Sequence, residues 1–337
     1  MNRRTMLKHA AATAGVAVTT SQATAGAAPV GEEILGQGAF RYRVVPGWGR
    51  LDRAEVPVED CHAITENRDG QIVLLTNDTR NNVVVYGRDG RFVSKRENRF
   101  PAAHALEFRV DRRGDELLWI TDHQLSVVSL VTPDGRELKR LTPDTLSAKY
   151  PDLSKYHATN VAVLEGGDFF VSDGYGSHFI HHFDPEWKYI GSFGGAGSAP
   201  EHLKQPHAVW VDTRGGREEL LVCDRGNALL KWFTPRGELL RTVAVPGSQP
   251  SNIAPMADGH IAIASLNAMI LILDRRNRVV SVVGGEAPVY EGDTLKPMVN
   301  ANGVFNHPHD VYADAAGALY VAQWNSNRSY PIKLDLA

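Results

Sequence analysis

The chain has 337 residues, of which 43% are hydrophobic and 22% are charged, the balance of an ordinary globular protein. Its formal net charge of −3 provides no basic field for nucleic acid or an anionic membrane surface, which argues against both as partners. After the N-terminus, no segment approaches the ~18 apolar residues of a membrane span, so we expect none.

The N-terminus has the pattern of an export signal. Arg3 and Arg4 precede a short apolar run over 10–18 and an Ala-x-Ala site at 23–25. A charged start, a short apolar run and a small-residue site are typical of a secretory signal peptide. The paired arginines resemble those of the bacterial twin-arginine route. We therefore predict an export signal over 1–27 and a periplasmic or extracellular location.

The remainder of the chain, 35–337, divides into six similar units. Each unit has an apolar strand, a Gly-containing turn, a second apolar strand, an Asp- or Asn-bearing loop, a third strand, a tight turn and a last strand. The units begin near the following residues: His62, His104, His157, His207, Ser251 and His309. Four strands in units of about 40–50 residues are typical of a β-propeller. We predict an all-β, six-bladed propeller, with five or seven blades as alternatives.

The sixth unit has only three strands, and the missing one is predicted to be the segment 40–45, just after the signal. Such a strand joins the two ends of the chain and removes an exposed sheet edge. Cys61 and Cys223 fall in the first and fourth units, which lie opposite each other in a ring of six. A disulfide needs Cα atoms within about 7 Å, so we expect two buried thiols.

The position that opens each unit carries most of the candidate chemistry. It holds, in order, His62, His104, Thr159, His207, Ser251 and His309. His104, His207 and His309 occupy alternate units, so a closed ring would place them about a third of a turn apart. Three histidines and an open position are the ligand set of catalytic zinc, although imidazole also suits Fe, Cu and Ni.

Two further residues near this set could support the ligands. Ring orientation in metal sites is usually fixed by a hydrogen bond to the second ring nitrogen. Asp310 directly follows His309 and could make such a bond, or it could close an Asx turn instead. His62 is either a supporting residue of the same kind or a side chain that faces the channel without touching the metal.

Two loops that follow second strands carry distinctive side chains. Tyr175 lies in the third unit and Arg225 in the fourth, each shortly after an aspartate, Asp173 and Asp224, that we expect to brace the loop. A phenol and a guanidinium beside a metal could transfer a proton and hold an anion. The alternative is a tyrosine at the rim and a solvated arginine.

These segments resemble NHL-repeat propellers, most closely the peptidyl-α-hydroxyglycine α-amidating lyase (peptidylamidoglycolate lyase) family. Segments 171–175 and 224–227 look like that family's tyrosine and arginine motifs, and Pro206-His207 and Pro308-His309-Asp310 look like its zinc-binding blade starts. The resemblance implies zinc on His104, His207 and His309, catalytic roles for Tyr175 and Arg225, and room for a structural calcium ion. It implies cleavage of a carbinolamide, R-CO-NH-CH(OH)-COO⁻, to a primary amide and glyoxylate.

The chain departs from this family in the first unit. There the family has an arginine that grips the substrate carboxylate, whereas this sequence has Asn77 in that slot and Arg80 three residues later. Two other functions therefore stay open beside a lyase acting on a small molecule or peptide. One is a non-catalytic NHL-type module that binds a protein, glycan or peptide. The other is a metal-dependent hydrolase such as a lactonase, although six-bladed lactonases generally hold calcium through oxygen ligands.

Overall fold

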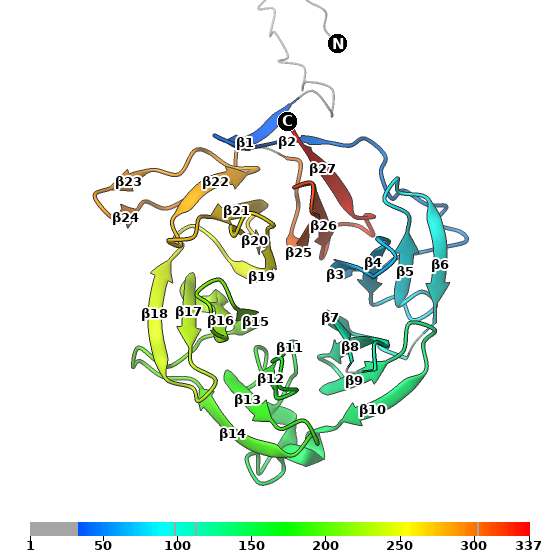
Figure 1. Ribbon diagram of the computed structural model, residues 1–337, viewed down its shortest axis with the longest axis vertical. Helices are drawn as coiled ribbons and strands as arrows, with labels where there is room; N and C mark the ends of the chain where they lie inside the picture. The colour runs from blue at the N-terminus through cyan, green and yellow to red at the C-terminus, as the bar shows by residue number, and fades with distance from the viewer. Residues whose placement is uncertain (1–32, 98, 112, 302) are drawn as a thin grey trace, which may run out of the picture.

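The computed structural model describes residues 33–97, 99–111, 113–301 and 303–337. Six antiparallel sheets stand around a central axis, so the predicted six-bladed, all-β propeller is confirmed (Figure 1). The export signal predicted over 1–27 lies outside the described residues. Within the described ranges, no helix is both long enough and apolar enough to cross a membrane.

Each blade is a meander whose first strand lies nearest the axis (Figure 1). The strands of the six blades, from the inside outwards, are: β3 (Cys61–Glu66), β4 (Ile72–Thr76), β5 (Val83–Tyr86) and β6 (Phe92–Arg96); β7 (Ala103–Val110), β8 (Glu116–Asp122), β9 (Val127–Val131) and β10 (Glu137–Leu141); β11 (Asn160–Val163), β12 (Phe169–Ser172), β13 (Phe179–Phe183) and β14 (Tyr189–Gly194); β15 (Pro206–Asp212), β16 (Glu219–Asp224), β17 (Leu229–Phe233) and β18 (Leu239–Ala244); β19 (Pro250–Pro255), β20 (Ile261–Ser265), β21 (Met269–Leu273) and β22 (Val279–Val283); β25 (Pro308–Ala313), β26 (Leu319–Gln323) and β27 (Ile332–Leu336).

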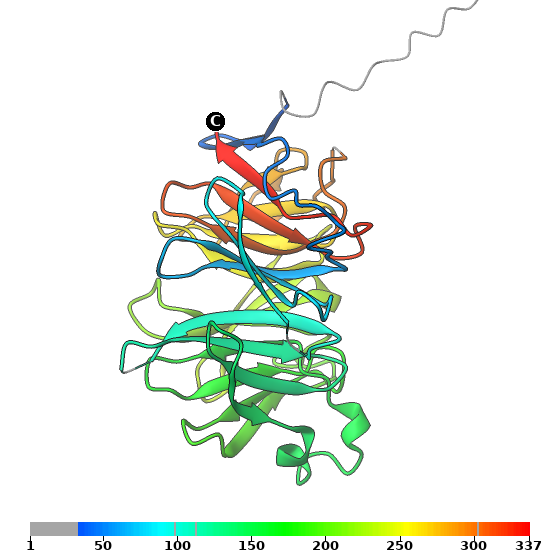
Figure 2. The ribbon, with the colours of Figure 1, turned by 90° about the vertical axis from the view of Figure 1, so that its right-hand side faces the viewer.

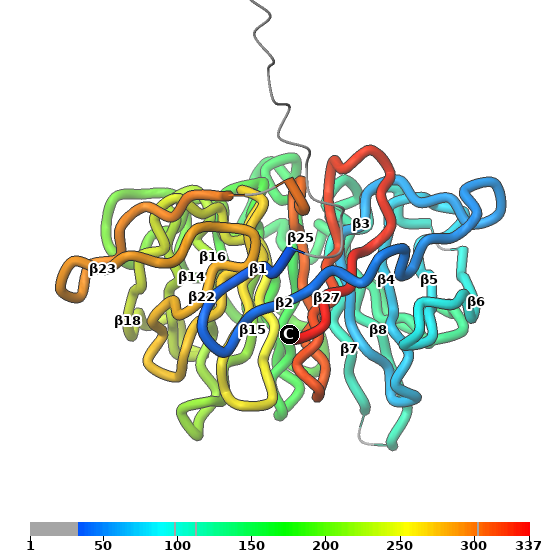
Figure 3. The backbone as a smooth tube through the Cα atoms, turned by 90° about the horizontal axis from the view of Figure 1, so that it is seen from above, coloured from blue at the N-terminus to red at the C-terminus, as the bar shows by residue number. Residues whose placement is uncertain are grey.

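The sixth blade is completed by the N-terminal strand β2 (Phe40–Val44), which pairs antiparallel with β27. The predicted closing strand is thereby confirmed. A strand that we did not predict, β1 (Ile34–Gln37), pairs with β2 and adds a fifth strand to this blade. The backbone N–H of Gln37 donates to Ser281 Oγ at 2.9 Å, and its side-chain Oε1 accepts from Val282 N at 2.8 Å. The β1–β2 hairpin therefore ties blade 6 to blade 5 (Figure 3).

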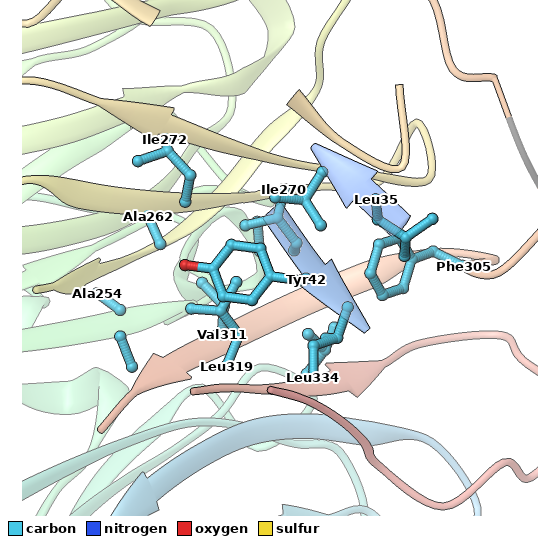
Figure 4. Packing of buried hydrophobic residues seen from close by; sticks show 14 of the residues in the cluster. Leu35, Tyr42, Ala254, Ala262, Ile270, Ile272, Phe305, Val311, Leu319 and Leu334 are labelled. Carbon is cyan, nitrogen blue, oxygen red and sulfur yellow. The ribbon is translucent and has the colours of Figure 1, made fainter. Parts of the chain in front are cut away.

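The core consists of six apolar clusters, one between each pair of neighbouring sheets. The cluster between blades 5 and 6 contains Tyr42 of the closing strand, fully buried among side chains of both sheets (Figure 4). Cys61 and Cys223 are unpaired and buried, as predicted. Because every cluster joins two blades, apolar burial holds the inner strands at fixed positions around the axis.

Two connections between blades are longer than the rest. Two 3-10 helices, η1 (Pro143–Leu146) and η2 (Leu153–Lys155), link blades 2 and 3 and lie at one end of the molecule in Figure 2. Between blades 5 and 6, a hairpin of β23 (Tyr290–Glu291) and β24 (Thr294–Leu295) projects outward from the ring in Figure 1.

A β-bulge interrupts the innermost strand at the opening position of five blades. The register shifts fall at these residues: His62, His104, His207, Ser251 and His309. In blade 3 the strand instead begins at Asn160, just after Thr159. A bulge adds an unpaired residue to one strand and changes the direction of its side chain. The bulges explain how residues of five separate strands can face the same axis.

Candidate metal centre and cavity

The three histidines of alternate blades meet at the axis. The ring centroids are 4.8 Å apart for His104 and His207, 4.7 Å for His104 and His309, and 4.8 Å for His207 and His309. All three side chains are buried. The imidazoles therefore form a nearly equilateral triangle, the arrangement expected from their sequence spacing.

Each imidazole in this triangle is oriented by the backbone of the next blade. The Nδ1 atoms lie at hydrogen-bond distance from carbonyl oxygens: 2.7 Å from His104 to Thr159, 2.6 Å from His207 to Ser251 and 2.7 Å from His309 to His62. A carbonyl oxygen can only accept, so this network assigns the hydrogen to Nδ1 in every ring. Each Nε2 is left with a lone pair, the form in which imidazole binds a metal.

The electrostatics of the triangle also favour neutral rings. Burial lowers the pKa of His104 and His309 well below its ordinary value, and neighbouring imidazoles lower it further. For His207 burial is again the main cause, followed by the positive charge of Arg225. Desolvation penalises the charged imidazolium, so the rings stay unprotonated and able to bind a cation.

A fourth histidine, His62, joins the triangle. Its Nδ1 lies 3.4 Å from Nε2 of His309, and one ring nitrogen each of His62, His104 and His309 lie within 4.8 Å of one another. These three histidines form a group that could hold a metal ion. His207 is outside that particular group, although its ring is in contact with those of His104 and His309.

Asp310 does not orient a ligand as one of our two interpretations expected. Its carboxylate accepts hydrogen bonds from the backbone N–H groups of Ile64 at 2.9 Å and Val311 at 2.8 Å. The Nδ1–H groups of His104, His207 and His309 already donate to backbone carbonyls, so none of them is free to donate to a carboxylate. His62 does support His309, but it does so through its backbone carbonyl, which accepts from the His309 ring.

Tyr175 and Arg225 lie beside the histidines. The Tyr175 hydroxyl is 3.1 Å from Nε2 of His104 and 3.0 Å from Nε2 of His207. The Arg225 guanidinium carbon lies 5.3 Å from the centre of the Tyr175 ring. Arg225 is only 9% exposed, and its guanidinium makes no hydrogen bond or ion pair with any other described residue. The structure thus places a phenol at the imidazole nitrogens and an unpaired cation next to it.

The loops that carry these two side chains are braced by buried aspartates, as expected. Asp173 accepts from the backbone N–H groups of His157 and Ser177, both at 2.7 Å. Asp224 accepts from the N–H of Lys204 at 2.7 Å and from the side chain of Asn227 at 2.8 Å. Carboxylates that satisfy several backbone donors fix loop geometry.

A cavity of about 810 Å³ opens above the histidines. Its lining includes His62, His104, His309, Tyr175 and Arg225. His207 does not line the cavity itself, although its Nε2 lies 3.0 Å from the hydroxyl of Tyr175, which does. A volume of this size is that of a typical small-molecule or peptide-end pocket.

On its blade-1 side the cavity has an acidic and a neutral polar side chain and no arginine within the described ranges. Asp60 and Asn77 line it, whereas Arg80 lies outside. The Arg80 guanidinium is instead bound by Asp78, with Nε at 3.0 Å and Nη2 at 2.7 Å from its two oxygens. Among the described residues that line the cavity, Arg225 is therefore the one lysine or arginine, and it is the side chain that could bind an anionic group.

The sequence analysis missed one lining residue, His123. Its ring centre lies 5.4 Å from those of both His104 and Tyr175. His123 follows Asp122, which accepts from the N–H of Ala102 at 2.8 Å in the way that Asp173 and Asp224 brace their loops. An alignment of these loop aspartates would have placed His123 in the position of Arg225.

No family model matches the chain. Peptidylglycine alpha-amidating monooxygenase of Rattus norvegicus is 22% identical over 311 residues, covering 79% of this chain and 30% of that protein. Peptidyl-glycine alpha-amidating monooxygenase B of Xenopus laevis is 27% identical over 242 residues, covering 68% of this chain and 26% of that protein. The chain is distantly similar to these amidating enzymes and spans less than a third of their length.

Solved structures share the fold. A streptogramin B lyase superimposes with a TM-score of 0.57 at 13% identity, covering 92% of this chain and all of that one. A virginiamycin B lyase from Staphylococcus aureus gives a TM-score of 0.53 at 12% identity, covering 82% of this chain and 95% of that one. At such low identity these likenesses show the propeller architecture alone.

Proposed function

We propose that this protein is an exported, zinc-dependent carbon–nitrogen lyase. Its substrate would be an α-hydroxyglycine-like carbinolamide, R-CO-NH-CH(OH)-COO⁻, and its products a primary amide and glyoxylate. The observation that carries the proposal is the Tyr175 hydroxyl, which sits 3.0–3.1 Å from Nε2 of two histidines in the axial triangle. The distant similarity to amidating enzymes supports the same reaction.

The donor set fits a catalytic zinc ion. His104, His207 and His309 would hold it through Nε2, since each Nδ1–H is committed to a backbone carbonyl. When bound, zinc would supply Lewis-acid polarisation of the substrate hydroxyl. Nitrogen ligands of this kind do not suit calcium, which prefers oxygen, so the site chemistry also favours a lyase over a calcium-dependent lactonase.

Tyr175 would move the proton. Its Oη lies at the imidazole nitrogens and Tyr175 lines the cavity, so the hydroxyl is within reach of a substrate hydroxyl held there. The Tyr175 hydroxyl gives its own proton to the departing nitrogen, which leaves as the amide, and takes the hydroxyl proton of the carbinolamide in exchange. The C–O bond becomes the C=O of glyoxylate as the C–N bond breaks, and the phenol is regenerated. Atoms and charge balance without a further reactant.

Arg225 would hold negative charge. The Arg225 guanidinium is 9% exposed, lies over the Tyr175 ring and has no hydrogen-bond or ion-pair partner among the described residues, so its donors are free to bind an anion. It faces the substrate carboxylate and the charge that develops on oxygen as the C–N bond breaks. Arg80 cannot share this role, because Asp78 binds it outside the cavity.

The N-terminal segment belongs to the same proposal. A signal over 1–27 that begins with paired arginines would send the protein through the twin-arginine route to the periplasm or beyond. Accumulation of a shortened chain outside the cytoplasm, abolished by Arg3→Lys together with Arg4→Lys, would support this part. Unchanged export of that double variant would contradict it.

The test of the reaction is glyoxylate release from α-hydroxyhippurate, with and without added zinc. We expect release by the zinc-loaded wild type and by Tyr189→Phe, a matched loss of one hydroxyl that contacts Ser192 in an outer strand. We expect release from Tyr175→Phe to be at least about 100-fold slower. A wild type that binds zinc but releases no glyoxylate would contradict the lyase, and would favour a non-catalytic propeller that binds a protein or peptide.

A further inference from the structure

The opening position of blade 1 breaks the pattern of the axial ring. In the other two blades that supply a carbonyl to a histidine, this position holds a small hydroxyl residue, Thr159 or Ser251. The Ser251 hydroxyl bonds to the backbone of blade 6, at 2.9 Å from the carbonyl of His309. Blade 1 has His62 instead, although its carbonyl serves His309 in the same way. The supporting role therefore does not explain the imidazole.

The His62 ring is aimed at the centre. Its one side-chain hydrogen-bond contact with a described residue joins Nδ1 to Nε2 of His309 at 3.4 Å. His309 has already committed its Nδ1–H to the carbonyl of His62, so its Nε2 presents a lone pair toward this nitrogen. His62 is 4% exposed, and no carboxylate of the described residues bonds to its ring to explain its position.

The separation of these two nitrogens is that of neighbouring ligands on one ion. Zinc binds imidazole nitrogen at about 2.0–2.1 Å, which in a tetrahedral site places adjacent nitrogens about 3.3–3.4 Å apart. His62 Nδ1 and His309 Nε2 meet this condition before any ion is considered. Without an ion, these two nitrogens can share only one hydrogen between them. A cation placed between them would instead be bound by a lone pair from each nitrogen.

We propose that His62 is a fourth zinc ligand, through Nδ1, so that the resting centre is a closed site of four histidines. This inference rests on the metal site of the proposed function and deepens it. Closed zinc sites are typically structural, whereas catalytic sites keep an open position. Access of a substrate to the centre would then require His62 to withdraw, which makes His62 a gate on the site.

The experiment compares wild type with His62→Ser, which introduces the residue type that blade 5 uses at the equivalent position, Ser251. His123→Ala is the matched control, because it removes a cavity histidine that is not one of the four proposed ligands. Zinc affinity is measured by competition with a chelator. The visible spectrum of the cobalt(II)-loaded protein is then followed as azide is added. Melting temperatures check that each variant is folded.

We expect His62→Ser to lower zinc affinity by more than about 100-fold, since loss of a merely supporting partner costs about 10–100-fold. We also expect azide to change the cobalt spectrum of His62→Ser but not those of wild type and His123→Ala. Equal zinc affinities together with an azide response in wild type would overturn the four-histidine site and leave the three-histidine lyase intact. A wild type that binds no zinc would overturn both.

Discussion

Nδ1 of His309 donates a 2.7 Å hydrogen bond to the backbone carbonyl of His62, across the boundary where the last blade meets the first. The same bond joins His104 to blade 3 and His207 to blade 5. The orientation of the imidazoles therefore depends on how closely neighbouring blades approach at the axis. The geometry of the candidate metal centre therefore depends on closure of the ring.

Tyr175→Phe should lower glyoxylate production at least about 100-fold, the usual minimum effect of losing a general acid–base group. The hydroxyl contacts only imidazole nitrogens among described residues, and the side chain is 36% exposed, so little packing changes. Steady-state kinetics, zinc content and melting temperature measure this. Loss of zinc together with activity would show that the hydroxyl has a structural role instead.

Arg225→Gln should lower kcat/KM by about 100- to 1,000-fold, comparable with removal of one transition-state donor. Arg225→Lys should recover part of the lost kcat/KM, because lysine keeps the positive charge but lacks the planar guanidinium that can bind an anion through two hydrogen bonds. The buried guanidinium has no hydrogen-bond or ion-pair partner among the described residues, so its removal should leave the melting temperature unchanged or raise it. A large fall in melting temperature with retained activity would contradict the anion-binding role.

Tyr42→Ala should reduce the free energy of unfolding by about 3–5 kcal/mol, because it leaves a cavity where the closing strand fills the space between blades 5 and 6. Tyr42→Phe should be neutral or slightly stabilising. The Tyr42 hydroxyl is buried without a hydrogen-bond partner among the described residues, and removing it ends that penalty. Urea unfolding of both variants measures the difference, and similar losses in both would contradict this assignment.

Asp173 should make stability depend on pH. Burial is the main cause that raises its pKa from 3.8 to about 6, so the folded state favours the protonated carboxyl. The protonated Asp173 carboxyl contributes to the free energy of unfolding in full below about pH 4. This contribution, up to about 3 kcal/mol, is lost as the pH rises through 6. Asp173→Asn should remove this part of the slope between pH 4 and 7. Unfolding free energies with an unchanged slope in the variant would contradict the assignment.

The fold was predictable because its signals are local and repeated. Strand periodicity and turn residues are visible in each unit, and a histidine recurs at the opening position of four of the six units. The segment 40–45 before blade 1 supplied the missing strand. The short strand β1 was not predictable in the same way. It has four residues and includes Gly36, and its main anchors are contacts of Gln37 with a blade distant in sequence.

The site was predictable only in part, because sequence identifies side chains but not their partners. The spacing of His104, His207 and His309 in the sequence predicted that their side chains meet at the axis. It could not show that backbone carbonyls, present at every residue, would occupy their Nδ1 atoms in place of Asp310. Nor could it show that Asp78 would bind Arg80 outside the cavity, or that a bulge would aim His62 at the centre.

Metal analysis of the full chain after reconstitution with zinc tests the central claim most directly. The account predicts about one tightly held zinc ion per chain in wild type and in Tyr175→Phe, and almost none in His104→Ala combined with His207→Ala. The His182→Ala control removes a histidine that pairs with Asp168 away from the triangle, and it should retain the ion. A wild type that holds no more zinc than the double variant would contradict the account.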